Sequence, residues 1–157
     1  MCVQGLSTAF TNSNIEAGII HCRALLEFLG LRCDPRDPSK LIARSGKRDD
    51  DFVIEDFVGP AGPLVKVTVE QAIAPYAGPK DEAEKAFASI IHCANKGLAH
   101  MTGGHIVDLQ DIGLYEIASR GVPVLVSNYF YVALGLPTPD YELAKTLRNL
   151  PDDDERG

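Results

Sequence analysis

The sequence predicts an all-α fold, a helical bundle of four main helices plus short extra elements. Apolar residues recur at helical spacing along Ile15–Leu29 and again along Phe87–Thr102. A third long stretch, Ile106–Val132, is predominantly apolar. Strand and helix compete only in the β-branched stretch Leu64–Tyr76, where no partner strand is evident, so helix is favoured there as well.

The first helix is expected to begin at Ser13 or Asn14, either of which can cap it, and to run to about Leu29. Residues 1–11 read as a loose lead-in that precedes the domain. Gly30 closes the helix. Its apolar stripe consists of Ile15, Ile19, Cys22, Leu26 and Leu29.

The middle of the chain carries short elements. Pro35 and Pro38 break any continuous helix in residues 31–51. A short apolar segment at 52–57 and a Gly-Pro turn at 59–63 precede the helix favoured at 64–76. The next helix begins near Lys80 and ends at the glycine pair 103–104. Its core-facing stripe is Ala83, Phe87, Ile91, Ala94, Leu98 and Met101.

The last part of the chain is expected to hold the long helix Ile106–Val132, which Gly121 and Pro123 should kink or split in two. A short final helix is predicted at Asp140–Asn149. Residues 151–157 form an acidic tail that is predicted to be disordered. The chain is therefore expected to be one domain, residues 12–150.

Composition narrows the class of protein. The net charge of −7 and the pI of about 5.0 argue against general nucleic-acid or acidic-membrane binding. The four cysteines show no CxxC pair or zinc-ligand spacing, which indicates reduced thiols in a cytosolic protein. The segment Gly121–Pro139 carries no charge, but prolines and polar residues interrupt it, so a buried core helix is favoured over a membrane span. No signal peptide and no cofactor are predicted.

Two charged sets are candidate functional or structural groups. The first is a basic run that gathers Arg36, Lys40, Arg44, Lys47 and Arg48, followed directly by acidic residues. It is either a solvated loop whose charge blocks neutralise each other or a loop that contacts phosphates. The second set is Glu16, Arg23, Glu27, Glu55 and Asp56. These residues are predicted to form a buried polar network that fixes the register of two segments.

The block Asn95-Lys96-x-x-Ala99-His100-Met101-Thr102 carries a family resemblance, together with the blocks at 21–28 and 50–57. The chain resembles a group of uncharacterised bacterial helical proteins, which are in turn similar to the HEPN superfamily. That resemblance implies a helical bundle, a homodimer, and in catalytic members metal-independent RNA cleavage by an Arg and a His. His100 matches the His and Lys96 or Asn95 the polar position, but position 95 is Asn and position 93 is Cys, so Lys96 would have to supply the cation.

Other interpretations of these residues stay open. His100, in the last turn of its helix, can simply bond carbonyls of that helix end. A metal site would need His92, His100 and His105 with nearby carboxylates, yet no E-x-x-H pair is present, so no metal is predicted.

The sequence therefore predicts a non-catalytic interaction or regulatory module of HEPN-like type, cytoplasmic and without a membrane segment. It is predicted to be a homodimer, with a further protein partner as a possibility. The apolar segment Val122–Leu136, which one small core would not hide completely, adds support for the dimer. The alternatives are a ribonuclease that uses His100 and Lys96 with RNA as its partner, and a metal-binding bundle.

Overall fold

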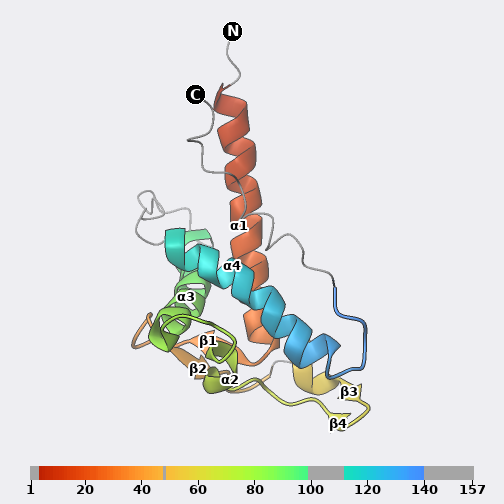
Figure 1. Ribbon diagram of the computed structural model, residues 1–157. Coiled ribbons are helices and arrows are strands. Elements are labelled where there is room, and N and C mark those ends of the chain that lie inside the picture. Colours follow the sequence, from red (N-terminus) through yellow and green to blue (C-terminus); the bar gives the residue numbers. More distant parts are fainter. Residues whose placement is uncertain (1–3, 48, 99–111, 140–157) are drawn as a thin grey trace.

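Three long helices pack against one another and form the frame of the molecule (Figure 1). The computed structural model describes residues 4–47, 49–98 and 112–139. Its helices are α1 (Gln4–Phe28), α2 (Val69–Ile73), α3 (Lys80–Cys93) and α4 (Ile112–Val126), with the 3-10 turn η1 (Ile54–Asp56) and the π-helical turns η2 (Ala94–Leu98) and η4 (Ser127–Tyr131). Its strands are β1 (Leu31–Cys33), β2 (Leu41–Ala43), β3 (Val58–Gly59) and β4 (Gly62–Pro63).

The prediction of an all-α fold is wrong, because the described residues also form two small antiparallel sheets of two strands each. In the first sheet Leu31 lies opposite Ala43 and Cys33 opposite Leu41. In the second sheet Val58 lies opposite Pro63. Strands of two or three residues are too short to display the alternating pattern by which a strand is recognised in a sequence. The fold is therefore mixed α and β, with helices predominating.

Helix α1 is longer than its sequence signals suggest. It begins at Gln4, so residues 4–11, which were expected to be a loose lead-in, belong to the helix. Its carboxyl-terminal half packs against α3 and α4, and its amino-terminal half extends beyond them (Figure 1). Ile19 and Leu26 on the predicted stripe are buried, whereas Ile15 on the same stripe is 54% exposed. The apolar stripe of α1 therefore continues beyond the part of the helix that packs against the rest of the protein.

The core lies where α1, α3, α4 and the β1–β2 hairpin meet. Its fully buried side chains are aliphatic, and Phe87 from α3 adds an aromatic ring. Gly121 of α4 allows a close approach, since a Cβ there would lie 2.7 Å from Cζ of Phe87. The largest fully buried side chains are Leu26, Leu29, Leu31, Ile54, Ile90, Ile91, Leu125, Val67 and Val122.

Gly121 and Pro123 lie within the single helix α4, which changes to the π-helical turn η4 at Ser127. Helix α3 begins at Lys80, as predicted, and continues into η2 at Ala94. The diglycine, the expected start of the long helix before residue 112, the final helix Asp140–Asn149 and the acidic tail lie outside the described residues.

The helix predicted at 64–76 forms over only part of that segment. Residues 64–68 form neither helix nor strand, with Thr68 in an extended conformation, and only Val69–Ile73 form helix α2. Thr68 caps this helix, because its hydroxyl accepts a bond from the Gln71 N–H while the Gln71 side chain accepts one from the Thr68 N–H. Residues 64–68 make separate backbone bonds to Phe57 and Leu29 rather than a ladder.

A junction at Gly30 joins three segments that are distant in sequence. Gly30 has a φ of +95°, which glycine adopts without strain, and it ends α1. The carbonyl of Gly30 accepts a bond from the Arg44 N–H at 2.7 Å, and the carbonyl of Leu29 accepts one from the Val67 N–H at 2.9 Å. The alkyl chain of Lys66 covers the glycine so closely that a Cβ would lie 2.6 Å from its Cγ.

Candidate functional site

The motif residues that the structure describes stand on the surface. Asn95 and Lys96 lie on η2, directly after α3, and both are exposed. Lys96 is near enough to Cys33 to lower the pKa of its thiol, against the larger raising effects of burial, Asp34 and Asp37. His100 lies outside the described residues.

Most of the cations in the basic run form ion pairs with carboxylates of the same chain. Lys40 Nζ donates to Glu84 Oε2 at 2.9 Å, and this hydrogen bond raises the pKa of Lys40. Arg44 forms an ion pair with Asp51.

Lys47 forms an ion pair with Asp56 and lowers the pKa of that carboxyl. Arg36 is exposed in the turn of the β1–β2 hairpin, and Arg48 lies outside the described residues. Arg44 and Lys47 thus pair with the acidic block that follows the run, whereas Lys40 pairs with Glu84 on α3.

The residues of the predicted polar network lie in separate places. Arg23 Nε donates to Glu27 Oε1 at 3.0 Å, as i,i+4 neighbours on α1. Glu16 is exposed further along the same helix. Glu55 Oε2 instead lies 3.5 Å from Lys66 Nζ, and Asp56 forms an ion pair with Lys47. No buried polar or charged residue occurs within the described ranges, so these pairs lie at the surface, where each contributes little to stability.

Among the described residues, no three His, Cys, Asp or Glu side chains are grouped so that they could hold a metal ion. His92 is half-buried on α3, and His100 and His105 lie outside the described residues. The described cysteines Cys22, Cys33 and Cys93 are free thiols, and burial raises the pKa of the first two. Among the described helices, none combines the length and the apolar run that a membrane crossing needs.

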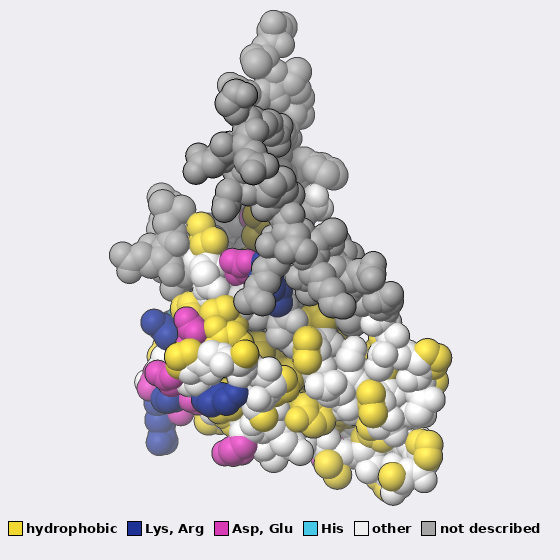
Figure 2. Space-filling model, in the orientation of Figure 1, with side chains coloured by type: hydrophobic (Ala, Val, Ile, Leu, Met, Phe, Trp, Pro, Cys, Tyr) yellow, Lys and Arg dark blue, Asp and Glu magenta, His cyan; other side chains and the backbone are white. Residues whose placement is uncertain are grey.

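A different surface has the features of a binding site. It combines residues 57–65 with residues 128–136, and neither segment contains a charged residue. We refer to it as the charge-free end. Figure 2 shows this end, at the right of the view, without acidic or basic side chains on the visible face. Four large aliphatic side chains are exposed on it: Val58 (71%), Val65 (72%), Val132 (58%) and Leu136 (47%).

The two segments touch each other directly. A Cβ on Gly59 would lie 2.2 Å from the carbonyl oxygen of Ala133, so only glycine fits at that point. A Cβ on Gly135 would lie 3.5 Å from Pro60, which is ordinary contact distance. These contacts place the tip of the β3–β4 hairpin beside the chain that follows η4, and they make one surface from segments about 70 residues apart in the chain.

Three aromatic rings hold the charge-free end on the helices. Phe57 and Phe130 meet edge to face at 4.9 Å between ring centroids. Phe28 of α1 meets both rings, Phe57 at 5.8 Å and Phe130 at 5.2 Å, again edge to face. Such pairs add about 0.5–1.5 kcal/mol each beyond the area that they bury. The hairpin is therefore fixed to α1 and to η4.

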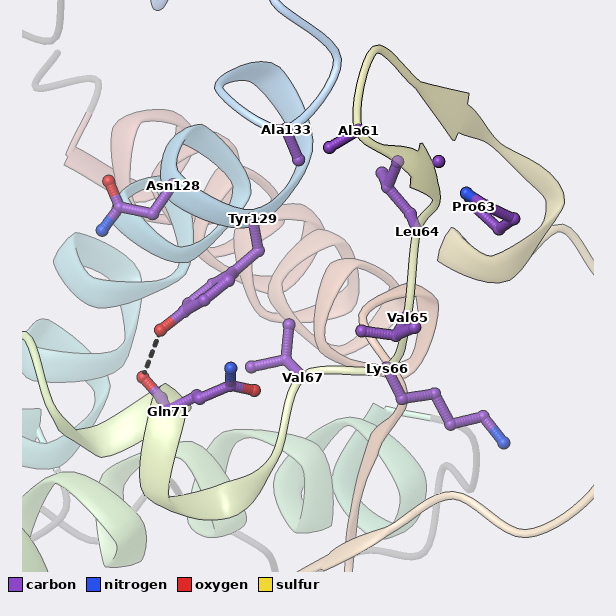
Figure 3. Close-up of a pocket in the computed structure, with 11 residues that line it drawn as sticks. Ala61, Pro63, Leu64, Val65, Lys66, Val67, Gln71, Asn128, Tyr129 and Ala133 are labelled. Carbon is purple, nitrogen blue, oxygen red and sulfur yellow. Dashed lines mark hydrogen bonds between the residues drawn. The ribbon is translucent and has the colours of Figure 1, made fainter.

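A shallow pocket of about 240 Å³ opens within the charge-free end (Figure 3). Val65 and Val67 form one wall, and Tyr129 faces them from η4. The Tyr129 hydroxyl donates to the carbonyl of Gln71 at 3.0 Å. The ammonium of Lys66 points away from the pocket, toward Glu55 and the carbonyl of Arg44.

The chemistry of this pocket favours binding rather than catalysis. The Tyr129 hydroxyl, the Gln71 side chain and the Lys66 ammonium already have partners within the chain. A general acid or base needs a titratable group directed at the substrate, and the pocket lining offers none in that position. What remains is an apolar concave surface with the Asn128 amide at its rim (Figure 3).

Sequence reasoning identified only half of this surface. The uncharged segment Gly121–Pro139 is visible in the sequence, and its apolar part Val122–Leu136 exceeds what one small core is expected to hide. The second half, residues 57–65, is also uncharged, but nothing in the sequence indicates that it lies beside the first. Comparison with models of protein families, with curated protein sequences and with solved structures found no match. The HEPN-like resemblance therefore stays a prediction that rests on its motif blocks.

Proposed function

We propose that this protein is a non-catalytic interaction module, regulatory in role and cytoplasmic, that binds an uncharged apolar segment of a partner protein at its charge-free end. The observation that carries the proposal is the charge-free end itself, on which four large aliphatic side chains are exposed and one of them, Val65, lines the pocket. Apolar side chains exposed singly are ordinary, whereas a contiguous group marks an interaction site.

The chemistry of the expected ligand follows from the surface. An uncharged partner buries no charged group when it binds there. A charged partner would lose the hydration of its charge and find no counter-ion on this surface. An aliphatic or aromatic side chain that enters the pocket would contact Val65, Val67 and the ring of Tyr129. The expected ligand is therefore a short peptide segment with an apolar anchor residue.

The first experiment is selection of peptides from a random display library on the purified protein, followed by affinity measurements by fluorescence anisotropy. Val65→Asp places a charge at the pocket wall and should weaken the selected peptides about tenfold or more. Ile112→Asp is the matched control, because Ile112 is an exposed aliphatic residue at the start of α4, where a carboxylate suits the helix. Equal binding by both variants, or no enriched peptide, would contradict the proposal.

The alternative, metal-independent RNA cleavage by His100 and Lys96, has less support. Three cations of the basic run are already in ion pairs. RNA cleavage in EDTA, measured on the wild type and on Lys96→Ala and His100→Ala, separates the two functions. Cleavage by the wild type that both variants lose would favour the ribonuclease.

A further inference from the structure

One edge of the β3–β4 hairpin opens on the pocket of the charge-free end. The Leu64 N–H donates to the Phe57 carbonyl at 2.9 Å, so the hairpin keeps one further backbone bond past the pair formed by Val58 and Pro63. Figure 3 shows the chain running on from β4 through Leu64 to Val65 without a turn. Successive residues of an antiparallel strand direct their N–H and C=O groups to opposite edges. The main-chain groups of Val65 are therefore directed to the edge away from β3.

This edge is accessible and has main-chain groups to offer. Within the part of the chain that the structure describes, neither the N–H nor the C=O of Val65 has a hydrogen-bond partner. Val65 is 72% exposed. Residues 61–67 line the pocket as an unbroken run, whereas an extended chain that showed only its side chains would contribute every second residue. The backbone of this run therefore faces the pocket together with its side chains.

We infer that the bound peptide joins this edge as an added β-strand, with its backbone hydrogen-bonded to the N–H and the C=O of Val65. This inference rests on the proposed function and names the conformation of its ligand. Side chains directly opposite each other on paired strands lie on the same face, about 4.5–5.5 Å apart. The peptide residue opposite Val65 therefore places its side chain in the pocket, beside Val65 and facing Tyr129.

Binding as a strand sets the pattern of the ligand sequence. Main-chain bonds need no charge on either partner, which suits the charge-free end. In an added strand the residues on either side of the anchor point to the opposite face. The selected peptides should therefore share one apolar position whose two neighbours vary freely. A helical peptide bonds its N–H and C=O groups within itself and would share apolar positions three and four residues apart instead.

The first test removes single N–H groups from the peptide. The probe is the peptide most enriched in the display selection, synthesised with one backbone N-methyl group at each position in turn and measured by fluorescence anisotropy. N-methylation should weaken binding about fivefold or more at the residue that bonds the Val65 carbonyl, and it should leave the residues on either side unchanged. Equal affinity across the series would overturn the inference and leave the proposed function standing. Absence of any enriched peptide would overturn both.

The second test removes the N–H from the protein. Val65→Pro should weaken the same peptide about fivefold or more. Val58→Pro is the matched control, because Val58 is 71% exposed, faces the other edge of the same hairpin and does not line the pocket. Circular dichroism shows whether both variants fold. Equal binding by the two folded variants would overturn the inference.

A third measurement uses the wild type alone and so does not depend on the folding of a variant. Hydrogen exchange followed by NMR should show the Val65 amide proton exchanging about tenfold more slowly when the peptide is bound, with the Val58 amide unchanged. A Val65 amide that gains no protection at saturating peptide would overturn the added strand.

Discussion

The contact between α3 and α4 can be tested by adding a single methyl group. Gly121→Ala would place a Cβ 2.7 Å from Cζ and 2.8 Å from Cε1 of Phe87. An ordinary contact begins near 3.4 Å, and Phe87 is only 3% exposed, so its ring has little room to move. Overpacking of this kind costs roughly 1–3 kcal/mol, whereas Ala in a helix interior gains up to about 1 kcal/mol over Gly.

Gly18→Ala is the matched control, because Gly18 lies within α1 with nothing within 4 Å of its Cβ position. It gains the helix propensity without the clash. The two variants should therefore differ by roughly 1–3 kcal/mol, or roughly 2–12 °C in Tm for a chain of this size, with Gly121→Ala the less stable. Thermal and urea unfolding followed by circular dichroism measure the difference.

A double-mutant cycle assigns the cost to the ring. In a Phe87→Leu background the added methyl group has space, so Gly121→Ala should become neutral or favourable. If Gly121→Ala stabilises the wild type as much as Gly18→Ala does, the close packing of α3 on α4 inferred from these distances is refuted.

Three further outcomes are expected. Phe57→Ala should lower the free energy of unfolding by about 2–4 kcal/mol in urea titrations, since it removes a half-buried ring and two edge-to-face contacts; a loss under about 1 kcal/mol would contradict that role. The bonds from Lys47 and the Val53 N–H hold the pKa of Asp56 below its ordinary value of 3.8, so this carboxylate stabilises the fold above about pH 4 and ceases to do so as the pH falls further. The Tm difference between wild type and Asp56→Asn should accordingly shrink below pH 4, and a constant difference would exclude the linkage. Cys33, whose pKa burial raises, should react with iodoacetamide at pH 7.5 more slowly than a free thiol, and Lys96→Ala should slow it further; mass spectrometry of the alkylated peptides measures both rates.

The long helices could be predicted from the sequence because their apolar spacing is sustained. The stripe from Ala83 to Ile91 placed the start of α3 at Lys80, where the structure has it. The amino-terminal boundary of α1 was missed because Ser13 resembles a cap, while uncharged residues before it continue the helix. The sheets were missed for another reason. Leu31–Cys33 is three residues long, and its pairing with Leu41–Ala43 depends on a turn whose prolines suggested only irregular chain.

The candidate site was only partly predictable, because it is built from two segments that meet in space. Absence of charge in residues 121–139 is visible in the sequence, but the contact of Gly59 with Ala133 is not. The ion pairs of the basic run were anticipated as one interpretation, although the partner of Lys40 lies on α3, 44 residues away. Local charge patterns predict neutralisation, and they do not identify partners across the fold.

The junction at Gly30 has a consequence for synthesis on the ribosome. The carbonyls of Gly30 and Leu29, directly after α1, accept bonds from the N–H groups of Arg44 and Val67, so the junction at the end of this helix is completed by chain that emerges later. A nascent chain that ends before Arg44 lacks both donors, so these two carbonyls have no partner within the chain at that stage. Val67 closes the arrangement only when nearly half of the 157 residues have been made. The end of the first helix in sequence is thus completed only after chain well beyond it has been made.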